Sequence, residues 1–321
     1  MKAGNNKVKV VVAMSGGIDS SVAAALLKRA GFWVIGIFMR FWMDPVGWHL
    51  GKWNRCCSPE AEKRARLVAD HLKIPFYVLD LEKKFKKIIV DRFLKDYQLG
   101  LTPNPCVTCN KEIKFGLLIE KALSLGADFV ATGHYSRIKK IENRKFSVHH
   151  QQKIEYKLFK GKDKEKDQSY FLWMLNQKQL RRILFPIGDY TKDKVRQLAR
   201  KFHLPAVSKI PESQEVCFIP STTNDFLSRY LKLKHGKIVD KNGKVLGQHQ
   251  GLALYTIGQR KGIGLSGGPY YVMKKVQKKN LLVVTKNQRD LYQKEALLNN
   301  VNWLSGSKPK LPLRLKAKIR Y

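Results

Sequence analysis

Acidic residues are scarce in this sequence of 321 residues, which has 25 Asp and Glu against 62 Lys and Arg. The formal net charge is therefore +37 at pH 7, and the basic residues are spread along the whole chain. A field of this sign attracts polyanions, and nucleic acid is the first candidate among them. A general lysine bias would give the same composition, so the charge alone does not establish RNA binding.

Cysteine and long apolar runs are also scarce. The five cysteines, in a chain of this size, do not suggest the disulfide framework of a small secreted protein. No run is as long as the roughly 20 apolar residues that span a bilayer. The first strand is predicted within a few residues of the N-terminus, which leaves no room for a signal or transit peptide. We therefore expect a cytoplasmic protein with no membrane segment.

A phosphate-binding loop is predicted near the N-terminus. The apolar run Val10–Met14 indicates a strand that is buried on both faces, and Ser15–Gly17 forms a turn before a helix that begins near Asp19. Adjacent glycines let backbone N–H groups approach an anion, and the helix start adds a partial positive charge. The loop lacks the Gly-Lys-Ser/Thr ending of a Walker loop. The alternative is an ordinary glycine-rich turn.

Strands and helices alternate through the first 133 residues. Strands are predicted at 10–14, 33–39, 76–80 and 127–133, with helices at 19–28, 58–72, 82–97 and 110–125. This order is typical of an α/β fold with a doubly wound parallel sheet. Ligands bind such sheets at the carboxyl ends of the strands, where Ser15–Gly17, Met39 and Gly133 lie.

Shorter elements follow. We predict a hairpin within 137–160, helices at 170–184, 193–202 and 224–231, and strands at 237–239, 244–246 and 281–284. Three prolines between residues 204 and 220 indicate a domain boundary. The predicted domains are a catalytic α/β domain over 1–219, a small mixed domain over 220–292, and the start of a C-terminal β-barrel domain over 293–321. The last of these ends in a strand-like segment and looks truncated.

Cys109 lies in a proline-flanked segment directly before the helix predicted at 110–125. A helix N-terminus lowers the pKa of a thiol, and Lys111 and Lys114 add positive charge nearby. The sequence therefore predicts a nucleophilic thiolate at Cys109. An inert buried cysteine and a zinc ligand are the alternatives, although a zinc site needs four ligands and no second cysteine pair has suitable spacing. Cys217, taken alone, is more typical of a structural cysteine.

Six motifs in one order resemble those of the bacterial tRNA-specific 2-thiouridylases, within the N-type ATP pyrophosphatases. They are Ser-Gly-Gly-Ile-Asp-Ser from Ser15, Thr-Pro-Asn-Pro-x-x-x-Cys-Asn-Lys-Glu-Ile-Lys-Phe from Thr102, Ala-Thr-Gly-His-Tyr from Ala131, Lys-Asp-Gln-Ser-Tyr-Phe from Lys166, Ser-x-x-x-Cys-Phe-Ile from Ser213 and His-Gln-Gly-x-x-x-Tyr-Thr-Ile-Gly-Gln-Arg-Lys-Gly from His249. The resemblance covers nearly the whole chain. It implies Mg²⁺- and ATP-dependent adenylation of the 2-carbonyl of the tRNA wobble uridine, followed by sulfur transfer, with release of AMP and pyrophosphate.

The resemblance also implies roles for individual residues. ATP would be bound by Ala13, Met14, Ser15, Gly16, Gly17, Ile18, Asp19, Ser20, Met39 and Gly133. Cys109 would be the nucleophile, and Cys217 would carry persulfide sulfur delivered by a donor protein. The target base would contact Asn104, Pro105 and Cys106, and the rest of the tRNA would contact His134, Lys166, Asp167, Gln168, Arg320 and Tyr321.

The chain departs from the family pattern in three places. Ala13 stands where Gly is frequent, Cys106 replaces an Asp of some members that is a candidate acid or base, and the family's last strands are missing after Tyr321. The cysteine at 106 opens an alternative, in which Cys106, Cys109 and Cys217 bind three irons of a [4Fe–4S] cluster.

Two other function classes remain open. One is a different ATP pyrophosphatase, such as a synthetase that acts on a small carbonyl substrate. The other is a tRNA-binding protein without catalysis. The Cys109 and Cys217 pair argues against both, and the retained phosphate loop argues against the second.

Overall fold

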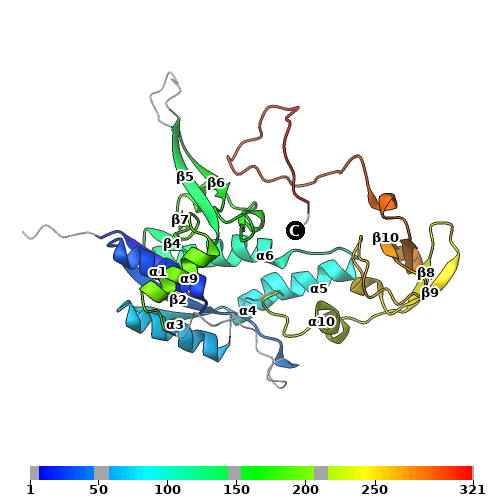
Figure 1. Ribbon diagram of the computed structural model, residues 1–321, viewed down its shortest axis with the longest axis horizontal. Coiled ribbons are helices and arrows are strands. Elements are labelled where there is room, and N and C mark those ends of the chain that lie inside the picture. The colour runs from blue at the N-terminus through cyan, green and yellow to red at the C-terminus, as the bar shows by residue number, and fades with distance from the viewer. Residues whose placement is uncertain (1–6, 47–57, 144–152, 206–215, 320–321) are drawn as a thin grey trace, which may run out of the picture. The chain divides into compact units, whose positions relative to one another are not determined.

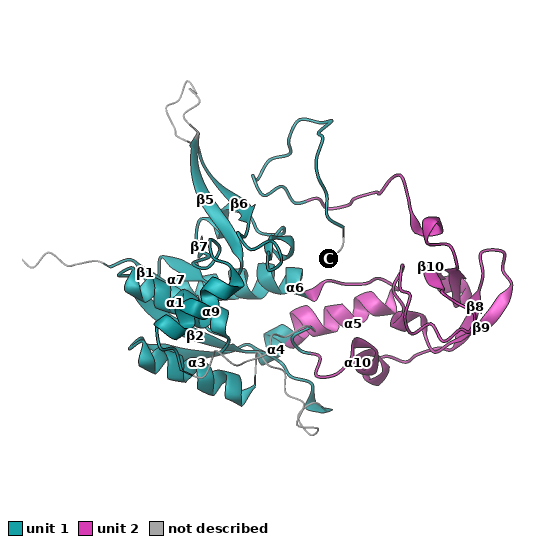
Figure 2. Ribbon diagram, in the orientation of Figure 1, with its two compact units in different colours: residues 1–85, 106–218, 302–321 teal, residues 86–105, 219–301 magenta. Residues whose placement is uncertain are grey.

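The computed structural model describes residues 7–46, 58–143, 153–205 and 216–319. The chain divides into two compact units, which Figure 2 colours separately. Unit 1 comprises residues 1–85, 106–218 and 302–321, and unit 2 comprises residues 86–105 and 219–301. Each unit is therefore assembled from segments that are distant in the sequence.

A parallel five-stranded sheet forms the centre of unit 1, in the order β3-β2-β1-β4-β7. Its strands are β1 (Lys9–Ala13), β2 (Trp33–Arg40), β3 (Phe76–Asp80), β4 (Phe129–Ala131) and β7 (Ile183–Leu184). The chain winds from β1 out to β3 and then returns to β4 on the other side of β1. The carboxyl ends of β1 and β4 therefore flank a topological switch point, where such sheets bind ligands. The predicted α/β fold is confirmed.

Helices cover the apolar strands of this sheet (Figure 1). Alternate residues of β1, Val10 and Val12, share a buried cluster with α1 (Ile18–Arg29), α3 (Pro59–His71) and α9 (Lys192–Lys201). Val11, on the opposite face of β1, is also fully buried, as expected for a doubly wound sheet. The helix predicted at 58–72 begins as expected, because the hydroxyl of Ser58 accepts the Ala61 N–H at 3.2 Å.

Three predicted helices differ from those observed. The helix expected at 82–97 consists of α4 (Glu82–Phe85), a π-helical turn η1 (Lys86–Val90) and α5 (Asp91–Gln98). The helix expected at 110–125 begins earlier, as α6 (Pro105–Thr108), the π-helix η2 (Cys109–Leu117) and α7 (Leu118–Ser124). Proline is well suited to a first helical turn, which explains the earlier start.

The helix expected at 170–184 was wrong. That segment contains the short helices η3 (Ser169–Phe171) and α8 (Gln177–Leu180), and then β7. Val130 and Ala131 of β4 pair with Ile183 and Leu184, so sheet pairing prevails over local helix propensity there.

A two-stranded hairpin leaves the body of unit 1 (Figure 1), as predicted for 137–160. It consists of β5 (Ser136–Asn143) and β6 (Lys153–Lys160), paired antiparallel with Lys139 opposite Lys157.

Unit 2 contains a separate four-stranded sheet, in the order β10-β11-β8-β9. Its strands are β8 (Gly236–Val239), β9 (Val245–His249), β10 (Tyr271–Val276) and β11 (Leu281–Thr285). The helix α10 (Thr223–Tyr230) and the short helices η4 (Leu252–Leu254), η5 (Gln277–Lys279) and η6 (Gln288–Leu291) complete the elements after residue 219. Three of these strands and α10 were predicted, whereas β10 was not.

The segment after residue 301 forms no strand within its described part, residues 301–319. It is instead tied to the rest of unit 1 by hydrogen bonds. Among them, Tyr170 Oη donates to the Ile319 carbonyl at 3.0 Å and Gln177 Nε2 donates to the Leu304 carbonyl. The strand expected there was wrong, because an extended segment becomes a strand only where a neighbour pairs with its backbone. The domain limits at 219 and 292 stay predictions.

None of the helices formed by the described residues is both long and apolar enough to cross a bilayer.

Candidate active site

Hydroxyl groups close the loop that follows β1. Ser20 Oγ donates to the Gly17 carbonyl at 3.1 Å and accepts the Ser15 N–H at 3.2 Å. Ser21 Oγ donates to the same carbonyl at 2.9 Å. The first N–H groups of α1 have no acceptors within the helix, and they add positive potential at the end of β1.

Two glycines allow the backbone to pack tightly around this loop. Gly16 has a φ of +71°, and an added Cβ would lie 2.2 Å from the Ala61 carbonyl oxygen of α3. An added Cβ on Gly133 would lie 2.6 Å from the Ser20 nitrogen. A Cβ on Gly17 would meet only Ser15 Oγ, at 3.5 Å. The backbone packs closely against the loop at Gly16 and Gly133, and it leaves open space at Gly17. That space is suitable for a phosphate group.

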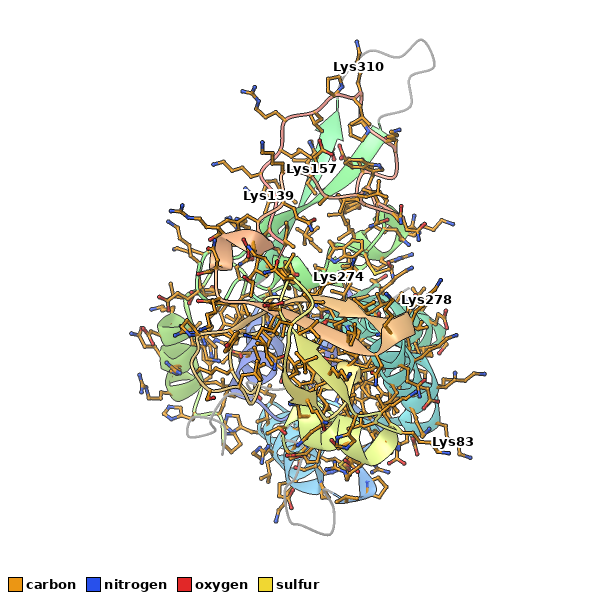
Figure 3. The ribbon with its side chains drawn as sticks, turned by 90° about the vertical axis from the view of Figure 1, so that its right-hand side faces the viewer. Lys83, Lys139, Lys157, Lys274, Lys278 and Lys310 are labelled. Carbon is orange, nitrogen blue, oxygen red and sulfur yellow. The ribbon has the colours of Figure 1, made fainter. Side chains whose placement is uncertain are left out.

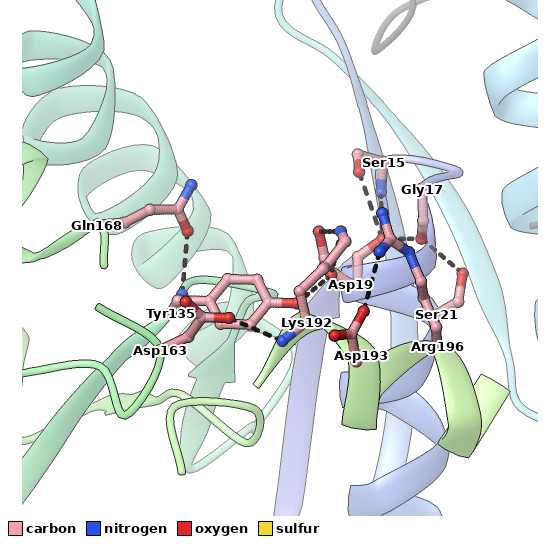
Figure 4. Close-up of polar contacts among 11 residues, drawn as sticks. Ser15, Gly17, Asp19, Ser21, Tyr135, Asp163, Gln168, Lys192, Asp193 and Arg196 are labelled. Carbon is pink, nitrogen blue, oxygen red and sulfur yellow. Dashed lines mark hydrogen bonds and ion pairs between the residues drawn. The ribbon is translucent and has the colours of Figure 1, made fainter. Parts of the chain in front are cut away.

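An ion pair crosses from α9 to the first turn of α1 (Figure 4). Lys192 Nζ lies 2.9 and 2.8 Å from the two carboxylate oxygens of Asp19. Tyr135 Oη donates to the same carboxylate at 2.7 Å. The Lys192 side chain is 7% exposed and that of Asp19 is 30% exposed, so the cation is the more deeply buried partner.

The segment from Gly161 to Ser169 holds these partners in place. Gln168 exchanges two hydrogen bonds with the Tyr135 backbone, at 2.9 and 3.0 Å. Asp163 Oδ2 accepts the Lys192 N–H at 2.9 Å, and this bond is the largest cause of the lowered pKa of Asp163. The buried Asp167 carboxylate accepts the N–H groups of Gly161 and Ser169. Asp167 and Gln168 therefore have roles within the protein that the expected tRNA contacts did not include.

The remaining predicted nucleotide-binding residues lie beside the loop. Ala13 ends β1, and the Met14 N–H donates to the Ile37 carbonyl of β2 at 2.9 Å. Met39 is buried near the end of β2, whereas Ile18 is half-buried at the start of α1. All ten residues predicted to bind ATP therefore lie at the carboxyl ends of strands of the sheet or in the first turn of α1.

Cys109 is buried inside a helical stretch that begins at Pro105, and it does not lie at a helix N-terminus. Burial raises the pKa of its thiol from 9.0 to about 11, and this effect outweighs the opposing charge of Lys114. The predicted lowering of this pKa was therefore wrong. Cys106, one turn earlier and half-buried, raises the pKa of Cys109 further.

Amide side chains join the π-helix η2, which starts at Cys109, to other parts of unit 1. Gln179 Nε2 donates to the carbonyls of Lys111 and Phe115 at 3.0 and 2.7 Å. Asn110 Nδ2 donates to the Phe171 carbonyl at 3.0 Å. Such π-helical turns occur frequently at functional sites.

His134 follows β4 in the chain and is buried. Its Nδ1 lies 2.7 Å from Thr132 Oγ1, and the rings of Phe115 and Phe185 lie 5.8 Å from its own. Burial, aided by Lys114, holds the pKa of His134 well below 6.5.

Cys217 is half-buried, and the contacts of its neighbour Phe218 show which side of the sheet this segment approaches. The next residue, Phe218, packs against Phe85 at 5.9 Å, and Phe85 stacks on Phe41 at 4.5 Å. Phe41 and Phe85 follow β2 and β3, whereas the helix that continues from Cys109 packs on β4. The phosphate loop after β1 therefore lies between the sides of the sheet that carry the two cysteines.

Other predicted contacts are dispersed. Asn104 is exposed, and Pro105 and Lys166 are half-buried. Arg320 and Tyr321 lie outside the described residues, as do Cys56 and Cys57. In the described ranges, no three His, Cys, Asp or Glu side chains converge as metal ligands, and Cys106, Cys109 and Cys217 all fall within those ranges.

Lys192 and Tyr135 were missed as site residues. Lys192 is one of 62 basic residues and lies 173 positions after Asp19, so nothing in its sequence context distinguishes it. Tyr135 belongs to the motif that starts at Ala131, and its position there was the one available signal.

Lysines on both units are labelled in Figure 3, and the hairpin carries two of them, Lys139 and Lys157. Arg137 and Lys139 of β5 lie on one face with Lys157 and Phe159 of β6, because residues two apart on a strand share a face. Lys139 and Lys157 are exposed and directly opposite each other, and Lys139 Nζ lies 5.6 Å from the Phe159 ring centroid.

Comparisons with known proteins place the chain among its relatives. Two family models match it, described as tRNA methyl transferase HUP domain over residues 8–221 and tRNA methyl transferase PRC-barrel domain over residues 224–286. A protein of Thermoanaerobacter sp. named tRNA-specific 2-thiouridylase is 47% identical over 98% of this chain and 84% of that protein. The protein of the same name from Carboxydothermus hydrogenoformans is 46% identical, with the same coverage. Among solved structures, NMN synthetase from Francisella tularensis has a TM-score of 0.38 and 14% identity, over 64% of this chain and 66% of that chain.

Proposed function

The chain belongs to the family of tRNA-specific 2-thiouridylases, and from this premise we infer that it is an ATP-dependent tRNA-uridine 2-sulfurtransferase. It adenylates the 2-carbonyl of the wobble uridine of tRNA and replaces that oxygen with sulfur, releasing AMP and pyrophosphate. The observation that carries this conclusion is the 47% identity to a tRNA-specific 2-thiouridylase over 98% of the chain. The phosphate loop at the switch point, with a cysteine on either side, agrees with it.

The loop supports the adenylation half of the reaction. A carbonyl oxygen is a poor leaving group, and adenylation converts it to part of AMP. The N–H groups at the start of α1 and the opening at Gly17 suit the phosphates of ATP. Asp19 is the carboxylate of this loop and supplies oxygen ligands of the kind that Mg²⁺ prefers, and Mg²⁺ would stabilise the phosphate charge.

The two cysteines support the sulfur-transfer half. A donor protein would load Cys217 as a persulfide, whose terminal sulfur attacks the activated carbon while AMP leaves with the former carbonyl oxygen. The Cys109 thiolate then attacks Cys217 Sγ, which leaves the terminal sulfur on the base and joins the two cysteines in a disulfide. An external thiol must reduce that disulfide before the next cycle. Because Cys109 is protonated at neutral pH in this structure, it must lose its proton before this attack.

Several assignments extend this proposal. Asn104, Pro105 and Cys106 contact the target base, and the tRNA contacts are His134, Lys166, Asp167, Gln168, Arg320 and Tyr321. The exposed basic face of the hairpin supports tRNA as the partner. The domains span 1–219, 220–292 and 293–321. A tRNA substrate also supports the expected cytoplasmic location.

The geometry favours persulfide chemistry over the cluster alternative, since Cys106, Cys109 and Cys217 do not converge as metal ligands. The matching family models carry a methyl transferase description, but methyl transfer requires neither a phosphate loop nor paired cysteines. A synthetase that acts on a small carbonyl substrate has no need of those cysteines either.

One assay tests the function. The protein is incubated with unmodified tRNA, ATP, Mg²⁺ and a persulfide donor, and 2-thiouridine and AMP are measured. We expect both products, and we expect Cys109→Ser and Cys217→Ser to lose thiolation while they still bind tRNA. AMP formation that ignores tRNA would indicate a small carbonyl substrate, and tRNA binding without AMP would indicate a non-catalytic protein. Stoichiometric iron and sulfide in protein purified anaerobically would support the [4Fe–4S] alternative instead.

A further inference from the structure

The last of the six motifs ends in a turn, residues 256–262, that has no role in the function proposed above. The Gly258 N–H donates to the Val272 carbonyl of β10 at 2.7 Å. The Gln259 side chain spans the turn, since it accepts one backbone N–H of the turn and donates to one of its carbonyls, both at 2.9 Å. These bonds favour one backbone conformation, so the turn presents its exposed side chains in a defined place.

Two adjacent basic side chains, Arg260 and Lys261, are exposed on this turn. The chain has no Asp or Glu between Asp240 and Asp290, so no carboxylate within that stretch can neutralise them. A guanidinium binds phosphate through two parallel N–H bonds, and an ammonium donates to phosphate oxygens as a point charge. The turn therefore has the chemistry that suits a sugar-phosphate backbone.

A hydrogen bond connects the turn to the segment that leads to the expected base contacts. Thr256 Oγ1 lies 3.2 Å from Thr102 Oγ1. Thr102 is followed closely by Asn104 and Pro105, which the proposed function places against the target base. All four residues belong to unit 2, which Figure 2 shows in one colour. Because two residues of extended chain span at most about 7 Å, Asn104 stays near the bond that joins this segment to the turn.

On the basis of the proposed function, which assigns Asn104 and Pro105 to the target base, we propose that Arg260 and Lys261 bind the tRNA backbone beside the wobble uridine. Their partners are the phosphates that flank this nucleotide. Phosphate contacts set the register of a nucleic acid on a protein, and a base that leaves its stack needs a strand that is held on either side of it. The bond between the two threonines keeps the base contacts and the backbone contacts together.

An acidic protein, such as the sulfur donor, is the opposing partner for a basic turn. Protein interfaces are typically centred on buried aromatic or aliphatic anchors. Within the described stretch 256–264, Ile257 is the one large apolar side chain that is exposed. An added Cβ on Gly264 would meet no atom within 4 Å, so open space adjoins the basic pair. These features favour an RNA strand over a protein surface.

The experiment compares two double variants, each of which removes two positive charges from unit 2. Arg260→Gln with Lys261→Gln removes the proposed contacts, whereas Lys237→Gln with Lys244→Gln removes two exposed lysines from β8 and the turn after it. Filter binding of tRNA over a salt series gives the slope of log affinity against log salt. We expect the first variant to lower this slope by roughly 1.4 to 1.8, so that its affinity deficit shrinks about seven- to twelvefold between 50 and 200 mM salt. The control should keep the slope of the unmodified protein.

A synthetic anticodon stem-loop RNA locates the contacted phosphates. Each of the two phosphates that flank the wobble uridine is replaced in turn by an uncharged methylphosphonate. The unmodified protein and the control variant should lose affinity severalfold for at least one of these RNAs. The variant of Arg260 and Lys261 should bind the substituted and the unsubstituted RNA equally, because it has already lost the contact.

Three results would overturn the proposal. They are an equal salt slope in the Arg260 and Lys261 variant and the control, an equal loss with methylphosphonate in that variant and the unmodified protein, and weaker binding of the persulfide donor with unchanged tRNA affinity. Urea unfolding confirms that both variants are folded, as expected for exposed residues. Failure of the proposed function looks different. Contacts to these phosphates without any 2-thiouridine or AMP would contradict that function and leave this inference standing.

Discussion

Cys109 and His134 both lie in the field of Lys114, but the cation affects them differently. For Cys109 the ammonium opposes the effect of burial, and burial prevails, so the thiol stays protonated. For His134 burial and the ammonium act together, and the ring stays neutral. The sequence showed the lysine and the cysteine but not how deeply the helix buries the thiol. That depth depends on packing from residues far away in the chain.

The alkylation of Cys109 should therefore rise steeply with pH. With a pKa of about 11, the thiolate fraction grows about tenfold per pH unit from pH 7 to 10. We expect the rate with iodoacetamide, followed by mass spectrometry of the Cys109 peptide, to show no plateau below pH 10. The control is the protein unfolded in urea, in which the alkylation rate of the same peptide should level off above about pH 9. A plateau below pH 8 in the folded protein would restore the thiolate predicted from the helix terminus.

His134 should make the folded state sensitive to acid. Folding lowers the pKa of His134. Its contribution to stability is therefore complete above about pH 6.5, and it is lost as the pH falls toward the pKa of the folded state. Urea unfolding at pH 7.5 and 5 should show a smaller pH effect in His134→Gln than in the unmodified protein. An equal effect would mean that His134 charges freely in the folded state.

At the scale of elements, four of the five strands of the parallel sheet and the loop after β1 could be predicted, because buried apolar runs and paired glycines are local signals. The segment from 170 to 184 could not, since Ile183 and Leu184 form β7 only because β4 offers them a free edge. The same limit applies to the site. The ten positions predicted to bind nucleotide follow from local motifs, whereas the ion pair between Asp19 and Lys192 depends on how α9 packs against α1.

The hairpin offers a test of tRNA binding. Lys139 and Lys157 face each other across β5 and β6, where like charges are unfavourable by up to about 1 kcal/mol. Replacing both with Thr should weaken tRNA binding and lower the slope of log affinity against log salt by roughly 1.4 to 1.8. Filter binding over a salt series measures this.

Lys140→Thr is the matched control, because Lys140 lies on the other face of the hairpin and pairs with Glu142 at 2.8 Å. Equal affinities in the double Thr variant and this control would remove the hairpin from the tRNA-binding surface.

At the scale of the whole molecule, the charge of +37 should dominate affinity without providing specificity. Phosphate contacts are independent of sequence, and 6 to 10 of them cost about 10³ to 10⁵ in affinity between 50 and 200 mM salt. We expect a substrate tRNA and the same tRNA with cytidine at the wobble position to lose affinity in parallel, so that their ratio stays constant. Competition binding at several salt concentrations measures the ratio. If this affinity ratio falls as salt rises, the charge itself distinguishes the two tRNAs, which would contradict the prediction.

Unit 1 is assembled from three separate stretches of the sequence, and the last of them follows the long segment of unit 2. During synthesis, the partners of Tyr170 and Gln177, which are the carbonyls of Ile319 and Leu304, leave the ribosome after all of residues 219–301. The parallel sheet can therefore form early, while the contacts that close unit 1 arrive late and carry the entropy of a long loop. Premature termination in unit 2 would leave a nascent chain with its nucleotide loop in place and its surface around Tyr170 uncovered, a form that cellular quality control would encounter.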